Sequence, residues 1–118
     1  MNANIMMNAI KEMVKQYASI ENEDEYRNSC IKMIEKTFDL TETEAEILLY
    51  LSEGDGYTYK WDWIDFTLIW REKENKITAR VYRPWNYYNT IYEFDANLFI
   101  RNIIRSLNDI DLDYQKLI

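Results

Sequence analysis

The sequence predicts an α+β fold: three N-terminal helices, a three-stranded antiparallel sheet and a C-terminal helix packed on the sheet. Three observations support this prediction. Apolar residues recur at three- and four-residue steps before residue 57, alternate in steps of two over 57–94, and return to helical spacing afterwards. With only two glycines and one proline, we expect one domain over 1–118. It would consist of an acidic helical part at 1–56 and an aromatic sheet with a helix at 57–118.

Capping signals delimit the predicted helices of the first part. The first apolar stripe contains Ile5 or Met6, Ala9, Ile10, Met13, Val14 and Tyr17. Asn22 followed by Glu25 resembles a capping box, and the stripe behind it predicts a helix that runs to about residue 37. Thr41 with Glu44 forms a firmer box in front of a third helix, which the glycines at 54 and 56 end.

The strands carry most of the aromatic side chains. Twelve of the eighteen aromatic residues, including all four tryptophans, lie between Tyr57 and Phe94. The alternation changes parity between Trp63 and Ile64, and a one-residue slip turns a strand's pattern onto the opposite sheet face. We therefore predict a β-bulge or a bend at 62–64, with the aromatic residues before it on a different face from those after it.

The remaining elements follow from turn signals. A polar loop is predicted at 72–75, and Pro84 ends the next strand or places it at an edge. A weaker alternation at 88–94 predicts a third strand, with Ile91 on its polar side. Asp95 is the predicted N-cap of the last helix, and the tail at 109–118 is expected to be a frayed helix or a docked extension.

The aromatic residues exceed what one sheet face can hide. One face is nearly filled by Ile64, Phe66, Leu68, Trp70, Ile77, Ala79, Val81, Trp85, Tyr88, Tyr92 and Phe94. Tyr57, Tyr59, Trp61, Trp63, Tyr82 and Tyr87 remain. Each aromatic side chain carries about 150–250 Å² of buriable surface. These six residues therefore form either a second core layer under the helices or an exposed docking surface.

Charge is unevenly distributed along the chain. Residues 1–56 hold twelve acidic and five basic residues, whereas residues 57–118 hold nine of each, so the net charge of -7 belongs to the first part. An acidic surface repels phosphate backbones and attracts basic protein surfaces. The expected partner is a protein with a basic surface, and the charge argues against direct nucleic-acid binding. The alternative is that the excess negative charge of residues 1–56 serves only to keep the protein soluble.

Several function classes lose support from composition alone. The chain contains no histidine, the commonest general base and metal ligand, and no catalytic motif, so we expect no enzyme activity, no cofactor and no metal. The single cysteine, Cys30, falls on the inner face of a predicted helix and fits a reduced, cytoplasmic protein. The N-terminal residues lack the basic start and apolar run of a signal peptide or membrane span.

Three helices followed by a hairpin is the element order of a winged helix, and residues 40–51 (LTETEAEILLYL) resemble an early helix of winged-helix regulators. This resemblance implies that the third helix reads a DNA groove. That helix carries Glu42, Glu44 and Glu46 but no lysine or arginine, so DNA would repel it. The sequence therefore argues against a DNA-reading role.

The leading hypothesis is a non-catalytic interaction protein that blocks a basic or nucleic-acid-processing partner, in the style of anti-CRISPR proteins of mobile elements or of toxin-immunity proteins. The acidic residues predicted to steer the partner are Glu21, Glu23, Asp24, Glu25, Glu42 and Glu46. The aromatic anchors are Tyr57, Tyr59, Trp61 and Tyr87. The alternative is a nucleic-acid or small-ligand module that uses Arg80, Arg83 and Trp85 together with Tyr87. The oligomeric state stays open.

Overall fold

The computed structural model describes the backbone at residues 1–61, 63–86 and 88–116, and the side chains at 1–60, 63–85 and 89–109. In chain order the elements are α1 (Ala3–Met13), the 3₁₀ helix η1 (Val14–Tyr17), α2 (Glu23–Phe38), α3 (Glu42–Ser52), β1 (Tyr57–Trp61), β2 (Ile64–Arg71), β3 (Lys76–Arg83), the 3₁₀ helix η2 (Pro84–Asn86), β4 (Tyr88–Asp95) and α4 (Ile100–Lys116). The α+β class is confirmed, with a C-terminal helix on an antiparallel sheet.

The predicted caps are present. The Asn22 side chain accepts a hydrogen bond from the Glu25 N–H at 3.0 Å, which starts α2. The Thr41 hydroxyl accepts from the Glu44 N–H at 3.2 Å, and a Glu44 oxygen accepts from the Thr41 N–H at 3.1 Å, so the box in front of α3 is complete. Local hydrogen bonds thus set where both helices begin.

The sheet has four strands in the order β1-β2-β3-β4, one more than the sequence predicts, because the parity change is a hairpin turn rather than a bulge. Trp61 pairs with Ile64, so only residue 62 and Trp63 join β1 to β2. Directly opposite residues of an antiparallel pair share a face. Tyr57 opposes Leu68, and these residues therefore lie on the same side of the sheet. For Tyr57 and Tyr59, the prediction that the early aromatics point to another face is therefore wrong.

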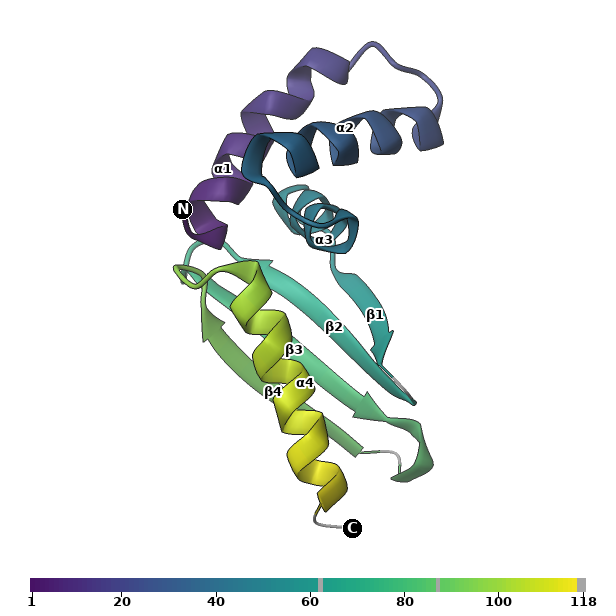
Figure 1. Cartoon of the computed structure of the whole chain (residues 1–118), viewed down its shortest axis with the longest axis vertical. Helices are drawn as coiled ribbons and strands as arrows, with labels where there is room; N and C mark the ends of the chain where they lie inside the picture. Colours follow the sequence, from purple (N-terminus) through teal and green to yellow (C-terminus); the bar gives the residue numbers. More distant parts are fainter. Residues whose placement is uncertain (62, 87, 117–118) are drawn as a thin grey trace.

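One sheet face is the core face. Its fully buried members are Ile64, Phe66, Leu68, Ile77, Ala79 and Val81. In Figure 1, α4 runs across the sheet, and Ile100, Ile103 and Leu107 of this helix belong to the same buried cluster. Figure 1 also shows that α1, α2 and α3 form a separate layer at one end of the sheet. Tyr57 and Tyr59 are half-buried and pack against the core.

The opposite face of the sheet is open. It carries Thr58, Thr67, Ile69, Arg80, Ile91 and Glu93, among others. Ile69 is 41% exposed and Ile91 is 60% exposed, so no helical layer covers either side chain. The first three helices therefore do not cover this face, and Ile91 lies on the polar side of its strand, as its sequence position predicts.

Contacts at two places fix the helical layer against the sheet. The Lys11 ammonium of α1 lies 2.9 Å from a Glu72 carboxylate oxygen and 4.8 Å from the Trp70 ring centroid. At the start of α1, the Ala3 N–H donates to the Leu98 carbonyl at 3.1 Å. Both ends of α1 are thereby attached to segments that flank the sheet.

Two local predictions are wrong. Asp95 does not cap α4, which begins five residues later at Ile100; its carboxylate accepts instead from the Asn97 N–H at 2.9 Å. Trp85 does not fill the core face, because it lies in η2 after the strand has ended and is 48% exposed. The predicted tail, by contrast, is helical as far as Lys116. No helix in the described part of the chain is long and apolar enough for a membrane span.

Candidate partner-binding surface

The acidic residues at the start of α2 are all exposed. They are Glu21, Glu23, Asp24 and Glu25. Three of them occupy the first turn of the helix, where a carboxylate interacts favourably with the unpaired N–H groups and the positive end of the helix dipole. This position explains their presence structurally, and it leaves their charge directed to solvent.

Arg27 links this acidic turn to the end of α3. Its guanidinium lies 3.0 Å from a Glu23 oxygen on its own helix and 3.3 Å from a Glu53 oxygen just past α3. The same guanidinium lies 4.4 Å from the centroid of the Tyr50 ring, within cation-π distance. One cation therefore holds two carboxylates and an aromatic ring in a common arrangement.

The network continues from α3 to the first strand. The Tyr50 and Tyr57 rings are 5.4 Å apart and tilted by 55°. Burial and the neighbouring Glu46 carboxylate raise the pKa of Tyr57 from 10.0 to about 12. Glu46 is half-buried, and Glu42, one helical turn before it, is exposed.

These residues form what we call the acidic–tyrosine surface. Its members are Glu23, Arg27, Glu42, Glu46, Tyr50, Glu53 and Tyr57. Four carboxylates against one guanidinium give it a net charge of -3. It unites three of the steering residues predicted from the sequence with one predicted anchor. Glu21, Asp24 and Glu25 flank it at the start of α2.

Sequence reasoning missed Arg27, Tyr50 and Glu53. Helical spacing contained the signal: Arg27 lies four residues after Glu23, and Glu42, Glu46 and Tyr50 follow one another at four-residue steps. The contact between Arg27 and Glu53 bridges 26 residues and has no such local signature.

The other predicted anchors do not join this surface. Tyr59 is half-buried and stacks on Phe66, with ring centroids 5.1 Å apart, and burial raises its pKa above the ordinary value. Tyr59 therefore packs mainly on the core, and its contacts do not connect it to the acidic–tyrosine surface. The side chains of Trp61 and Tyr87 lie outside the described residues.

The alternative arginine and tryptophan cluster is not one surface. Arg80 is exposed on the open face, whereas Arg83, three residues later, lies on the core face and is 1% exposed. The Arg83 guanidinium donates to the Thr90 hydroxyl at 3.4 Å. The two-residue alternation of a strand separates the arginines that sequence proximity groups together.

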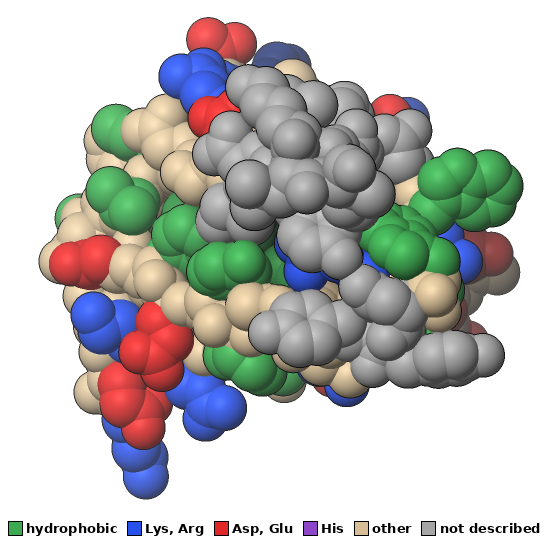
Figure 2. All heavy atoms as spheres, turned by 90° about the horizontal axis from the view of Figure 1, so that it is seen from below, with side chains coloured by type: hydrophobic (Ala, Val, Ile, Leu, Met, Phe, Trp, Pro, Cys, Tyr) green, Lys and Arg blue, Asp and Glu red, His purple; other side chains and the backbone are tan. Residues whose placement is uncertain are grey.

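Figure 2 shows the end of the molecule remote from α1–α3, where apolar side chains gather beside atoms that are not described.

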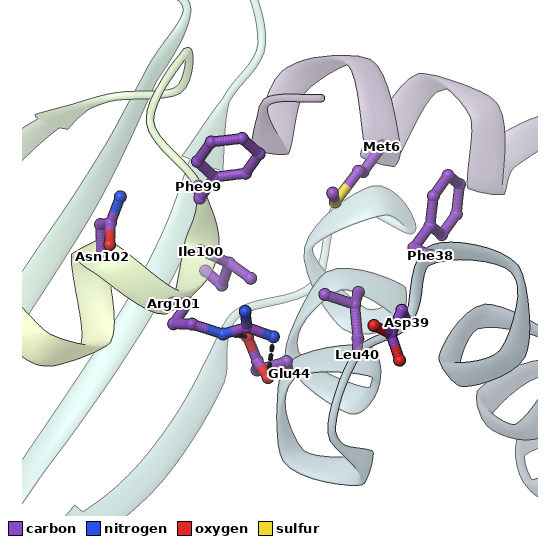
Figure 3. Close-up of a pocket in the computed structure, with 9 residues that line it drawn as sticks. All are labelled: Met6, Phe38, Asp39, Leu40, Glu44, Phe99, Ile100, Arg101 and Asn102. Carbon is purple, nitrogen blue, oxygen red and sulfur yellow. Dashed lines mark hydrogen bonds and ion pairs between the residues drawn. The ribbon is translucent and has the colours of Figure 1, made fainter.

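A cavity of about 290 Å³ opens between the start of α1, the connection of α2 to α3, and the start of α4 (Figure 3). Met6, Phe38, Asp39, Leu40, Glu44, Phe99, Ile100, Arg101 and Asn102 line it. Glu44 is 5% exposed and faces Arg101. Burial alone would raise the pKa of Glu44, but hydrogen bonds from Arg101 and Thr41 outweigh it and hold the pKa below 4.5. The Glu44 charge is therefore balanced by Arg101 within the protein, and Asp39 is the other carboxylate that lines the cavity.

Among the described residues, no three cysteine, aspartate or glutamate side chains are grouped so that they could hold a metal ion. Of the acidic–tyrosine surface and the cavity, the surface has the larger excess of negative charge, because the cavity is lined by two carboxylates and one guanidinium. Comparisons with protein-family models, with curated proteins and with solved structures find no match.

Proposed function

We propose that this protein is a non-catalytic interaction protein that inhibits a basic or nucleic-acid-processing protein partner. The inhibition would be of the kind that small anti-CRISPR or toxin-immunity proteins exert. The observation that carries the proposal is the contact network from Glu23 through Arg27 and Tyr50 to Tyr57. It joins the acidic start of α2 to the first strand as one surface.

In this proposal the carboxylates attract the partner and the tyrosine rings supply the contact area. Carboxylates on such a surface raise the rate of encounter with a cationic partner and stand in for the phosphates that the partner would otherwise hold. Tyrosines supply contact area with little rotamer entropy to lose, which is why they recur among the residues that dominate binding energy. Arg27 holds Glu23, Glu53 and Tyr50 in place before the partner arrives, which lowers the entropic cost of binding.

The nucleic-acid alternative has less support. It needs Arg80 and Arg83 on one surface, and they lie on opposite faces of the sheet.

Affinity capture tests the proposal. The immobilised protein is exposed to a cell lysate treated with nuclease, and retained proteins are named by mass spectrometry. We expect the wild type to retain a basic protein and the double variant Glu42→Lys, Glu46→Lys to lose it. The charge-matched control Glu74→Lys, Asp109→Lys changes exposed residues of the β2–β3 loop and of α4, and we expect it to retain the protein.

Two outcomes would contradict the proposal. One is equal capture by both double variants, because the charge of the acidic–tyrosine surface would then be irrelevant. The other is saturable quenching of tryptophan fluorescence by a single-stranded oligonucleotide at micromolar protein, which would favour the nucleic-acid alternative.

A further inference from the structure

Strand β4 forms a long and regular edge of the sheet. All eight of its residues pair with β3 in an unbroken register from Asp95 opposite Lys76 to Tyr88 opposite Arg83. Its sequence, YNTIYEFD, contains no lysine, arginine, proline or glycine. The other edge, β1, has five residues and carries Lys60. Natural edge strands avoid unwanted pairing by being short, charged, kinked or covered. β4 is neither short nor interrupted by proline, and its charged residues are limited to Glu93 and Asp95 near one end.

Within residues 1–61, 63–86 and 88–116, no other strand pairs with the outer side of β4. Figure 1 shows β4 as the outermost strand, while α4 lies over the sheet rather than beside it. Among the described residues, the backbone hydrogen bonds between elements reach this segment only at its end, where the Leu98 N–H donates to the Asp95 carbonyl. Asn89, Ile91 and Glu93 of the open face are all exposed. A strand with this shape presents a row of backbone donors and acceptors to whatever can pair with it.

We propose that β4 pairs with β4 of a second copy of this chain, antiparallel and about a two-fold axis at Ile91, so that two four-stranded sheets become one of eight strands. The backbone edge of an antiparallel strand complements itself, and a two-fold axis perpendicular to the sheet keeps the open face of both copies on the same side.

The side chains select this register. With Ile91 on the axis, Ile91 meets Ile91 and Asn89 meets Glu93, so the exposed isoleucines cover each other and each carboxylate faces an amide donor. A shift of the axis by one residue to Tyr92 places Ile91 against Glu93 and Asn89 against Asp95. A shift to Thr90 places Ile91 against Asn89. Only the register on Ile91 pairs apolar with apolar while opposing no two charges of the same sign among Asn89, Ile91 and Glu93.

This inference goes beyond the proposed function and does not depend on it. The acidic–tyrosine surface includes the first residue of β1, and β1 and β4 are opposite edges of the sheet. A dimer through β4 therefore leaves Tyr57 and its neighbours accessible in both copies, and the capture experiment and the dimer experiment can fail separately.

Sedimentation equilibrium measures the mass directly. We expect the wild type to approach twice 14.4 kDa at micromolar concentrations. We expect Ile91→Lys to weaken the dimer by about tenfold or more, because two ammonium groups would meet at the axis. The matched control is Ile69→Lys, which introduces the same charge on the same open face, in a strand that has neighbours on both sides. We expect that control to dimerise as the wild type does.

A second variant protects the test against misfolding. Ile91→Cys is smaller than the native residue, and under mild oxidation it should form a disulfide between two copies, whereas Ile69→Cys should not. The native Cys30 is buried and does not compete. A wild-type mass of one chain, equal weakening by both lysine variants, or equal crosslinking of both cysteine variants would each overturn the β4 dimer.

Discussion

One guanidinium holds both oxygens of a buried carboxylate: Arg101 Nε lies 3.0 Å from one Glu44 oxygen and Arg101 Nη2 lies 3.2 Å from the other. The same carboxylate accepts from the Thr41 N–H. Glu44 thus caps its own helix and connects α3 to α4 (Figure 3). Glu44 therefore couples the layer of α1, α2 and α3 to α4, the helix that packs on the sheet.

The first prediction concerns this pair. Glu44→Gln leaves an amide NH₂ facing the Arg101 donors, so we expect a loss of about 1–3 kcal/mol in the free energy of unfolding at neutral pH. Because the folded protein holds the pKa of Glu44 below its ordinary value of 4.5, the carboxylate stabilises the fold above that pH. This contribution is lost as the pH falls through the lower folded value. Urea denaturation at neutral and acidic pH measures both effects.

Glu42→Gln is the matched control, since Glu42 lies on the same helix but is exposed. We expect it to change stability by less than about 0.5 kcal/mol. If Glu44→Gln were as harmless as Glu42→Gln at neutral pH, the coupling role of Glu44 would be refuted.

Local signals explain how much of this fold the sequence predicts. The caps at Asn22 and Thr41 depend on residues three positions apart, so the starts of two helices are readable from the chain. The start of α4 is not, because Asp95 has an equally local alternative, a turn to the Asn97 N–H. Both uses of the aspartate look the same in sequence.

The hairpin between β1 and β2 cannot be told from a bulge in the sequence, for a related reason. A two-residue turn and a bulge both change the parity of an alternating pattern, and the turn at Trp63 lacks the Asn-Gly or Asp-Gly signal that would distinguish them. A bulge would place Tyr57 and Tyr59 on the face opposite Leu68 and Phe66, whereas the hairpin places them on the same face. The sequence predicts the candidate site only in part, because Arg27 contacts Glu53 and Tyr50 through the packing of α2 on α3.

The second prediction concerns alkaline pH. The folded protein raises the pKa of Tyr57 to about 12, so the neutral phenol stabilises the fold fully below pH 10.0 and progressively less as the pH rises towards the folded value. We expect Tyr57→Phe to lose less stability than the wild type over this range. Glu46→Gln should lower the pKa of Tyr57, whereas Glu42→Gln should not. Tyrosinate absorbance measures the pKa, and unchanged titration in Glu46→Gln would contradict the contact.

The third prediction concerns tryptophan exposure. Trp63 in the β1–β2 turn is 81% exposed, whereas Trp70 is 8% exposed under Lys11. We expect Trp63→Phe to remove a large acrylamide-quenchable part of the fluorescence and to change stability by less than about 0.5 kcal/mol. Trp70→Phe should leave quenching nearly unchanged while destabilising the fold by about 1–3 kcal/mol, since it opens a void under Lys11. If Trp70→Phe removed more of the quenchable fluorescence than Trp63→Phe, the placement of Trp63 in an exposed turn would be contradicted.

The fourth prediction separates the two partners of Arg27. The side chains of Arg27 and Glu53 are similarly buried, at 21% and 23% exposed. The Glu23 side chain is 74% exposed. Water screens an exposed pair more strongly, so the Glu53 contact should be the stronger although its distance is longer. In double-mutant cycles with alanine, we expect a coupling of about 0.5–1.5 kcal/mol for Arg27 with Glu53. For Arg27 with Glu23, we expect about 0.3–0.5 kcal/mol, as in other helix pairs. A larger coupling to Glu23 would mean that Arg27 belongs to α2 alone and does not hold the acidic–tyrosine surface together.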